Sequence, residues 1–244
     1  MKIIAIIPAR FASTRFPGKP LVNIQGKPMI QHVYDKAYSS GIFSKIVVAT
    51  DDQRIEKVVN DFGGLVMITS DDHQSGTDRC GEVINRLEEK FDVVVNIQGD
   101  EPFIHVEQLE QLISLFKNSK TQIATLKKKL NNIEDVQNVN VVKVVSDNNK
   151  RALYFSRNPI PFARGVNGDD WLKKHIYFKH IGLYGYRWSV LKKVVKLPIS
   201  SLEACESLEQ LRWLQNGFSI FIAETEHESI GIDTPEDLER LNKV

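Results

Sequence analysis

Residues 3–20 read IIAIIPARFASTRFPGKP, a short apolar run followed by a loop that is rich in cations. Residues 3–7 are too continuously apolar for a half-exposed strand, and such a run is typical of a strand buried on both faces of a parallel sheet. Pro8 cannot donate to a sheet ladder, so we expect the strand to end there. Open α/β sheets bind ligands at the carboxyl ends of their strands. The opening therefore predicts an α/β fold with a ligand site after its first strand.

The loop after this strand carries three permanent cations, Arg10, Arg15 and Lys19, among hydroxyls, a glycine and two prolines. Guanidinium forks and a compact ammonium match the oxygens of a polyphosphate. Any one of these cations is better explained as part of a solvated basic loop. The three together, beside a buried strand end, favour phosphate binding.

The rest of the chain shows two patterns of expected secondary structure. Apolar strands, separated by helical patterns, are expected at residues 45–49, 65–68 and 93–97, with Pro28 at the first position of the first helix. Beyond residue 120 the strand patterns at 121–130, 140–145, 151–155 and 177–186 follow one another as in an antiparallel sheet. A helical part at 202–214 and a strand at 219–223 complete the pattern. We therefore predict one domain, residues 1–244, with a mostly parallel sheet flanked by helices and an inserted antiparallel lobe at 121–187.

Composition excludes several classes. A net charge of +1 over 244 residues favours neither nucleic acid nor an anionic membrane as a partner. No apolar run approaches the length of a membrane span, and the apolar start is cut by Pro8 and Arg10, unlike a signal peptide. Cys80 and Cys205 lack metal-like spacing and are expected to be buried thiols in a reducing compartment. We expect a cytoplasmic protein.

Two acidic positions are candidate magnesium ligands. Asp100 follows the fourth strand, and its carboxylate is expected to face the cationic loop. Such an arrangement implies a charged ligand between them. A phosphate with bound Mg²⁺ fits, because the carboxylate can bind the metal and the cations can bind the phosphate. The alternative, which better explains Asp100 considered singly, is an ion pair with Arg10 or Lys19. At residues 233–237, Thr234 as N-cap explains the helix start but not Asp233. A second metal ligand at Asp233 and a plain helix start stay equally open.

Two further sets could bind organic groups. Small residues at 72–79 would let the backbone approach a base or ribose, and Arg79 would supply a donor fork, unless Ser75 or Thr77 is only a helix cap. Gln98, Arg157, His180 and Tyr184 could recognise an acidic sugar, although each is explained singly as a core or surface residue. The P-loop, dinucleotide-binding, nucleophile-elbow and HExxH motifs are all missing from the sequence.

A series of motifs then carries a resemblance over the whole chain. They are IPAR at 7–10, STRFPGKP at 13–20, HQSGTDR at 73–79, NIQGDEP at 96–102, SR at 156–157, KHIGLYGY at 179–186, LEQLR at 208–212 and GIDTPEDL at 231–238. The first block taken singly indicates only a sugar nucleotidyltransferase. The set, in this order, resembles the CMP-Kdo synthetases, the 3-deoxy-manno-octulosonate (Kdo) cytidylyltransferases.

The resemblance implies a Rossmann-like nucleotide-diphospho-sugar transferase fold, a homodimer formed through the antiparallel lobe, and transfer of CMP from CTP to Kdo for lipopolysaccharide synthesis. Carried over residue by residue, it implies that Arg10, Lys19 and Asp100 are catalytic, that Ser13 and Arg15 lie near the triphosphate, and that Asp100 and Asp233 hold Mg²⁺. It also implies a cytidine pocket of Ser75, Gly76, Thr77 and Arg79, and a sugar site of Gln98, Arg157, His180, Tyr184, Glu209 and Gln210.

The chemistry needs no protein nucleophile, because a positioned hydroxyl can displace pyrophosphate directly. The resemblance also implies ordinary Kdo as the acceptor, because Gly-Asp-Glu-Pro follows the fourth strand, where a related group that acts on amino-substituted Kdo has a different acidic motif. The rival functions are a cytidylyltransferase for another sugar acid such as sialic acid, a non-catalytic CTP-binding regulator, and a purely structural α/β domain.

Overall fold

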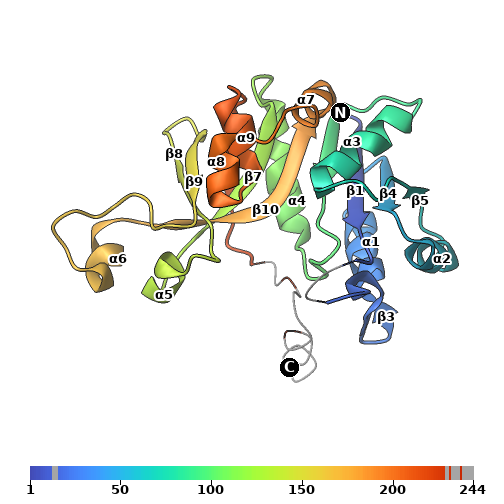
Figure 1. The fold of residues 1–244 in the computed structure, drawn as a ribbon, viewed down its shortest axis with the longest axis horizontal. Helices are drawn as coiled ribbons and strands as arrows, with labels where there is room; N and C mark the ends of the chain where they lie inside the picture. Colours follow the sequence, from blue (N-terminus) through green and yellow to red (C-terminus); the bar gives the residue numbers. More distant parts are fainter. Residues whose placement is uncertain (13–15, 229–230, 232–236, 238–244) are drawn as a thin grey trace. The chain divides into compact units, whose positions relative to one another are not determined.

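The chain divides into two compact units. Figure 1 draws the ribbon with its helices and strands labelled and coloured along the sequence. The computed structural model describes residues 1–12, 16–228, 231 and 237. The first unit comprises Met1–Glu110, Gly185–Val195 and Ser229–Val244, and the second comprises Gln111–Tyr184 and Lys196–Glu228. No helix among the described residues is long and apolar enough to cross a membrane.

The first unit is built on parallel strands in the order β6-β1-β4-β5. These strands are β1 (Ile3–Ala9), β4 (Lys45–Thr50), β5 (Val66–Ile68) and β6 (Val93–Asn96). Neighbouring side chains of a strand face opposite sides of a sheet, yet every residue from Ile3 to Ile7 is at most 4% exposed. Both faces of β1 are therefore covered, which confirms the expected buried parallel strand.

Strand β1 does not end at Pro8, as we had expected, but continues to Ala9, which pairs with Thr50. The Ile97 amide donates to the Ile6 carbonyl at 3.0 Å, so the backbone groups of Ile6, and by alternation those of Pro8, face β6. Strand β6 ends at Asn96. The missing N–H of Pro8 therefore falls beyond the β6 ladder, where it is tolerated.

The helices of the first unit follow the expected alternation. They are α1 (Met29–Ser39), α2 (Gln53–Asp61), α3 (Gly76–Arg86), α4 (Val106–Ser114), which continues into the second unit, and α7 (Trp188–Val194). Pro28 lies just before α1, at its N-cap, and not within its first turn. Helix α7 was not predicted, because seven residues are too few to establish a helical period. A 3₁₀ turn, η1 (Lys19–Leu21), and a short hairpin of β2 (Asn23–Ile24) and β3 (Lys27–Pro28) precede α1.

The second unit contains both parallel and antiparallel strand pairs. Strands β7 (Ile123–Lys129) and β11 (Ile220–Glu224) are parallel, whereas β8 (Lys143–Ser146) is antiparallel to both β9 (Ala152–Ser156) and β10 (Phe178–Arg187). The last three residues of β10 belong to the first unit. The short helices are η2 (Leu115–Lys117), α5 (Ile133–Gln137), η3 (Gly168–Asp170) and α6 (Trp171–Lys174).

The single helical part expected at 202–214 is in fact two helices, α8 (Ser201–Glu206) and α9 (Gln210–Gln215). Ser207 adopts the left-handed conformation, with φ 52° and ψ 48°, and ends α8. Glycine or asparagine usually marks a left-handed helix end, and serine does not. The sequence therefore did not predict the break between the two helices. The expectation for the cysteines is half wrong: Cys80 is buried in α3, but Cys205 is exposed because it faces solvent on α8.

Candidate active site

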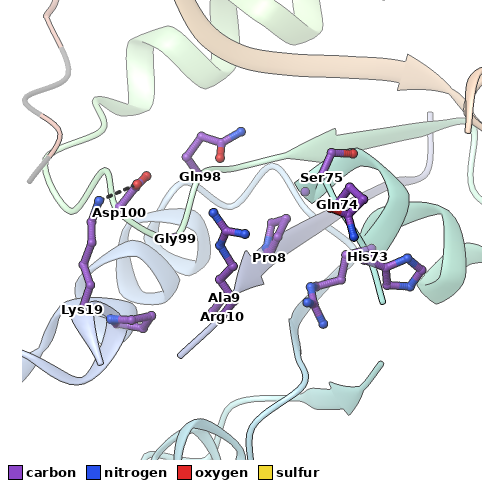
Figure 2. Close-up of a pocket in the computed structure, with 13 residues that line it drawn as sticks. Pro8, Ala9, Arg10, Lys19, His73, Gln74, Ser75, Gln98, Gly99 and Asp100 are labelled. Atoms are coloured by element: carbon purple, nitrogen blue, oxygen red, sulfur yellow. Dashed lines mark hydrogen bonds and ion pairs between the residues drawn. The ribbon is translucent and has the colours of Figure 1, made fainter. Parts of the chain in front are cut away.

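A cavity of about 230 Å³ opens in the first unit, where β1 and β6 end and α3 begins. Figure 2 shows side chains from β1, from η1, from the loop before α3 and from the turn after β6 around it. It is lined by Pro8, Ala9, Arg10, Lys19, Pro20, His73, Gln74, Ser75, Gly76, Arg79, Gln98, Gly99 and Asp100. The cavity thus lies at the carboxyl ends of parallel strands, where the sequence predicted a ligand site.

Lys19 and Asp100 form an ion pair in this cavity, with Nζ 2.7 Å from Oδ2 (Figure 2). Lys19 is only 7% exposed, whereas the Asp100 side chain is 41% exposed. The carboxylate is therefore open to solvent, whereas the ammonium is buried and needs an anionic partner. A ligand phosphate can supply that partner in place of Asp100.

Gly99 brings Asp100 close to the end of β1. A Cβ atom on Gly99 would lie 2.6 Å from the carbonyl oxygen of Pro8, closer than such atoms approach in proteins. Only glycine therefore allows the backbone after β6 to pass directly against β1. Gly76 packs similarly, since its Cβ would lie 3.2 Å from the Pro8 ring.

The Arg79 guanidinium reaches the cavity from α3 but is committed to other groups. It is 3% exposed and donates to the Asp51 carboxylate at 2.7 Å, to the Thr69 hydroxyl and to the Ser70 carbonyl at 3.2 Å. It therefore ties α3 to the residues that follow β4 and β5. We had not singled out Asp51; its position directly after a strand end was the only signal in the sequence.

His73 and Glu82 fix the loop at the other side of the cavity. The Nε2 atom of His73 lies 2.6 Å from Glu82 Oε2, and the same carboxylate accepts bonds from the Ser70 amide at 2.9 Å and from Arg86 at 3.0 Å. Burial opposes ionisation of Glu82, but the bonds from Ser70, His73 and Arg86 hold its pKa below the ordinary value. Glu82 was not predicted, because nothing in the sequence marks its partners.

His180 lies in the second unit within an aromatic group. Its ring centroid is 5.1 Å from that of Phe155 and 5.3 Å from that of Tyr184, and desolvation lowers its pKa to about 3. Its Nε2 lies 2.9 Å from the Thr125 hydroxyl, which is also 3.0 and 2.9 Å from the carbonyls of Ile181 and Leu183. Because the one hydroxyl proton goes to a carbonyl, Nε2 is the donor to Thr125. The neutral ring then keeps Nδ1 as an acceptor.

Tyr184 is 7% exposed, and its ring packs edge-on against Trp213 with centroids 5.0 Å apart. Burial, and then the negative charge of Glu209, raise its pKa well above the ordinary value. Tyr184 is therefore a neutral phenol throughout the physiological range. Gln210, the first residue of α9, is buried in the same unit.

Arg157 is not the simple surface arginine that the sequence left open. Its guanidinium donates to the carbonyls of Glu206 at 2.7 Å, Val139 at 3.1 Å and Ser207 at 3.4 Å. The Glu206 carboxylate in turn accepts bonds from the Ser156 hydroxyl at 2.6 Å and the Arg157 amide at 2.9 Å. Arg157 thus fixes the turn between α8 and α9, from which Glu209 and Gln210 extend.

Comparison with known proteins agrees with this architecture. Residues 4–228 match the family model described as Cytidylyltransferase. The chain is 57% identical over 243 residues to the 3-deoxy-manno-octulosonate cytidylyltransferase of Phocaeicola vulgatus, covering 98% of this chain and 96% of that protein. It is 51% identical over 249 residues to the protein of the same name from Thermodesulfovibrio yellowstonii, covering 100% and 98%. The chain belongs to the 3-deoxy-manno-octulosonate cytidylyltransferase family.

Solved structures support the same assignment. The cytidylyltransferase chain is similar to a CMP:2-keto-3-deoxy-manno-octonic acid synthetase complexed with CTP, with a TM-score of 0.93, 42% identity, and coverage of 100% of this chain and 98% of that one. A 4-diphosphocytidyl-2C-methyl-D-erythritol synthase from Anaerococcus prevotii, at 14% identity and a TM-score of 0.65 over 99% and 97% of the chains, shares the fold. The predicted nucleotide-diphospho-sugar transferase fold is confirmed, and the protein is a nucleotidyltransferase.

The predicted site residues of this cytidylyltransferase fall into three groups. The cavity brings together Arg10, Lys19, Ser75, Gly76, Arg79, Gln98 and Asp100. Thr77 is buried in the first turn of α3 and does not line the cavity, and Ser75 also caps that helix by accepting from the Asp78 amide at 3.1 Å. Arg157, His180, Tyr184, Glu209 and Gln210 lie in the second unit. Ser13, Arg15 and Asp233 lie outside the described residues.

Proposed function

We propose that this cytidylyltransferase transfers CMP from CTP to the anomeric hydroxyl of Kdo and releases pyrophosphate. The observation that carries the proposal is the convergence of Arg10, Lys19 and Asp100 on one cavity of the first unit. Its substrates are suggested by relatives that match the chain almost end to end and are named for this reaction.

The cations of the cavity suit the leaving group. The sugar hydroxyl oxygen forms a bond to the α-phosphorus while the bond from that phosphorus to the pyrophosphate oxygen breaks, so negative charge grows on the pyrophosphate. Arg10 and Lys19 would bind the triphosphate and neutralise that charge. The ammonium of Lys19 is held in the cavity by Asp100 before any ligand arrives, and such preorganisation is a main protein contribution to phosphoryl transfer.

Asp100 fits a magnesium ligand. It presents a half-exposed carboxylate to a cavity whose other charged groups suit phosphate, and Mg²⁺ is commonly bound by one or two carboxylates together with substrate phosphates and water. When bound, the ion would withdraw charge from the phosphate oxygens and lower the pKa of the attacking hydroxyl. We propose Asp233 as the second protein ligand.

The neighbouring cavity wall suits the nucleoside. Ser75 and Gly76 expose backbone at the start of α3, and the immobilised Arg79 forms part of the same wall. We propose that Ser75, Gly76, Thr77 and Arg79 form the cytidine pocket, with Thr77 supporting it from within the helix. Ser13 and Arg15 would add contacts to the triphosphate.

The second unit suits a sugar acid. Neutral His180 offers Nδ1 as an acceptor for a sugar hydroxyl, and neutral Tyr184 offers a phenol. Arg157 would bind the carboxylate through guanidinium donors, five being available in an arginine and three being used by the main chain. We propose that these residues, together with Gln98, Glu209 and Gln210, bind Kdo.

We also propose that the enzyme is a cytoplasmic homodimer. Two free cysteines suit a reducing compartment. Within the antiparallel lobe, large apolar side chains are exposed at Val139, Leu153, Phe162 and Ile176, as expected of a surface that a second copy covers. Light scattering after gel filtration should give twice the mass of the chain, and a monomer at micromolar concentration would contradict the dimer.

The experiment that tests the reaction is pyrophosphate release from CTP by the purified protein, with and without Kdo, in Mg²⁺ and in excess chelator. Release that needs both Kdo and the metal is the expected result. Release with sialic acid but not with Kdo would reassign the acceptor. CTP binding without release, for any sugar acid, would indicate a regulator and overturn the proposal.

A further inference from the structure

A backbone hydrogen bond joins the residues next to two of the cavity cations, Arg10 and Lys19. The Gly18 amide donates to the Phe11 carbonyl at 3.0 Å. Arg10 directly precedes Phe11, and Lys19 directly follows Gly18. The contact between Phe11 and Gly18 therefore sets the spacing of Arg10 and Lys19 along the cavity wall.

The ring of Phe11 packs on this closure. Gly18 has φ 72°, and a Cβ atom there would lie 3.1 Å from two ring carbons of Phe11. The left-handed backbone and the close ring contact together make glycine necessary at this position. The Phe11 ring thus packs directly on the backbone of Gly18.

A second group holds the ring from helix α2. The guanidinium carbon of Arg54 lies 3.3 Å from the centroid of the Phe11 ring, within the range of a cation–π contact. A guanidinium stacks on an aromatic face better than an ammonium does, because it is planar and weakly hydrated. Arg54 itself is not among the residues that line the cavity.

The orientation of Arg54 is fixed by Asp52, the N-cap of α2. Arg54 Nε donates to Asp52 Oδ1 at 2.9 Å and Nη2 donates to Oδ2 at 2.6 Å, and the Arg54 amide also donates to Oδ1 at 2.9 Å. The hydrogen bonds from the Arg54 side chain lower the pKa of Asp52, so the pair stays ionised at neutral pH. The guanidinium is consequently held in one plane, with its edge on Asp52 and its face on Phe11.

We propose that Arg54 is a positioning residue for the nucleotide triphosphate: it holds Phe11 against Gly18 and thereby presents Arg10 and Lys19 to the phosphates at a fixed spacing. The inference rests on the proposed use of CTP. If Phe11 and Gly18 are fixed to each other before binding, less conformational entropy is lost when the ligand arrives, so the effect is expected in nucleotide affinity.

The side-chain exposure of Arg54, 61%, makes this role separable from a role in folding. Exposed ion pairs and exposed cation–π contacts contribute little to the stability of a fold. Replacing Arg54 should therefore leave the melting temperature nearly unchanged while it loosens the loop. Lys57, an exposed residue of the same helix, offers a control that removes the same charge.

The test measures CTP affinity by calorimetry, in Mg²⁺ and without a sugar acid, for Arg54→Ala, Arg54→Lys and Lys57→Ala. We expect Arg54→Ala to weaken binding about fivefold, as loss of one cation–π contact would, and Arg54→Lys to fall between it and the wild type. Lys57→Ala should change affinity by less than about twofold, since surface charges act weakly at physiological salt.

A second readout uses the protein without nucleotide. Hydrogen exchange at the Gly18 amide should accelerate in Arg54→Ala and not in Lys57→Ala. Unchanged exchange and affinity in Arg54→Ala, or equal weakening by both alanine variants, would overturn the proposal. If the wild type fails to bind CTP, the proposed function fails, and exchange at Gly18 still decides whether Arg54 holds the loop.

Discussion

The ammonium of Lys19 lies 2.7 Å from the carboxylate of Asp100, although the two residues come from different elements, η1 and the turn after β6. From sequence, a phosphate-binding lysine with a metal-binding aspartate and a plain ion pair were competing explanations. The structure shows the ion pair, and the pair lies inside the cavity where the phosphate and the metal ion would bind. The pair keeps the two charges neutralised and close together. A phosphate that binds the Lys19 ammonium would displace the Asp100 carboxylate, which could then bind the metal ion.

Asp100→Ala should abolish pyrophosphate release, by more than about 100-fold, while the free energy of unfolding falls by about 1–3 kcal/mol at most. The buried Lys19 ammonium loses its carboxylate partner, which accounts for the change in stability, whereas the much larger loss of activity reflects the missing ligand of the metal–phosphate group. Asp35→Ala is the control for loss of a half-exposed carboxylate: the Asp35 side chain is 44% exposed, close to the 41% of Asp100, and it forms an ion pair with Lys27 at 2.7 Å outside the cavity. A turnover rate near that of the wild type in Asp100→Ala would remove Asp100 from the mechanism.

Gly99→Ala should destabilise the protein by about 1–3 kcal/mol and weaken CTP binding, because its Cβ would meet the Pro8 carbonyl at 2.6 Å and push the strand ends apart. Gly182→Ala in β10 is the control, since a Cβ there meets no atom within 4 Å. Urea unfolding and CTP calorimetry measure the two effects. Equal stability of the two variants would show that the approach of Gly99 to β1 is not as close as described.

His180 should make the protein less stable in mild acid. Its folded pKa of about 3 lies below the unfolded value, so between roughly pH 6.5 and 3 the unfolded state takes up a proton that the folded state refuses. Stability therefore falls as the pH falls through this window, by about 1.4 kcal/mol from pH 7.5 to 5.5. His180→Gln should lose this part of the pH dependence in urea unfolding. An identical pH slope in both proteins would show that His180 is not held neutral.

Lys143→Met should lower the free energy of unfolding by about 3 kcal/mol. The buried ammonium donates to the carbonyl of Asn138 at 2.8 Å and to the carbonyls of Val141 and Arg157, which would all lose a donor. Because Arg157 would be loosened as well, the KM for Kdo should rise more than the KM for CTP. Lys129→Met, at an exposed end of β7, should do neither. Equal KM changes for the two substrates would separate Lys143 from the sugar-binding unit.

Local patterns in the sequence were sufficient for most of the elements. The buried run at residues 3–7 and the alternation of strands and helices up to α4 depend on period, proline and glycine, which act on neighbours in the chain. The same local reasoning failed at Pro8 and at Ser207. Whether a missing amide matters depends on where β6 ends, and the carbonyl of the left-handed Ser207 is bound by Arg157, which lies fifty residues away in the sequence.

The sequence by itself therefore determined the strand that leads to the site, the identity of the cations and carboxylates, and the family, because motif order and hydrophobic period can be read along one chain. Only the tertiary structure decided which charged and polar groups pair with one another. Lys19 with Asp100, Arg79 with Asp51, and Arg157 with the Glu206 carbonyl are separated by 81, 28 and 49 positions. Their free energies depend on distance and burial in space, and sequence spacing specifies neither.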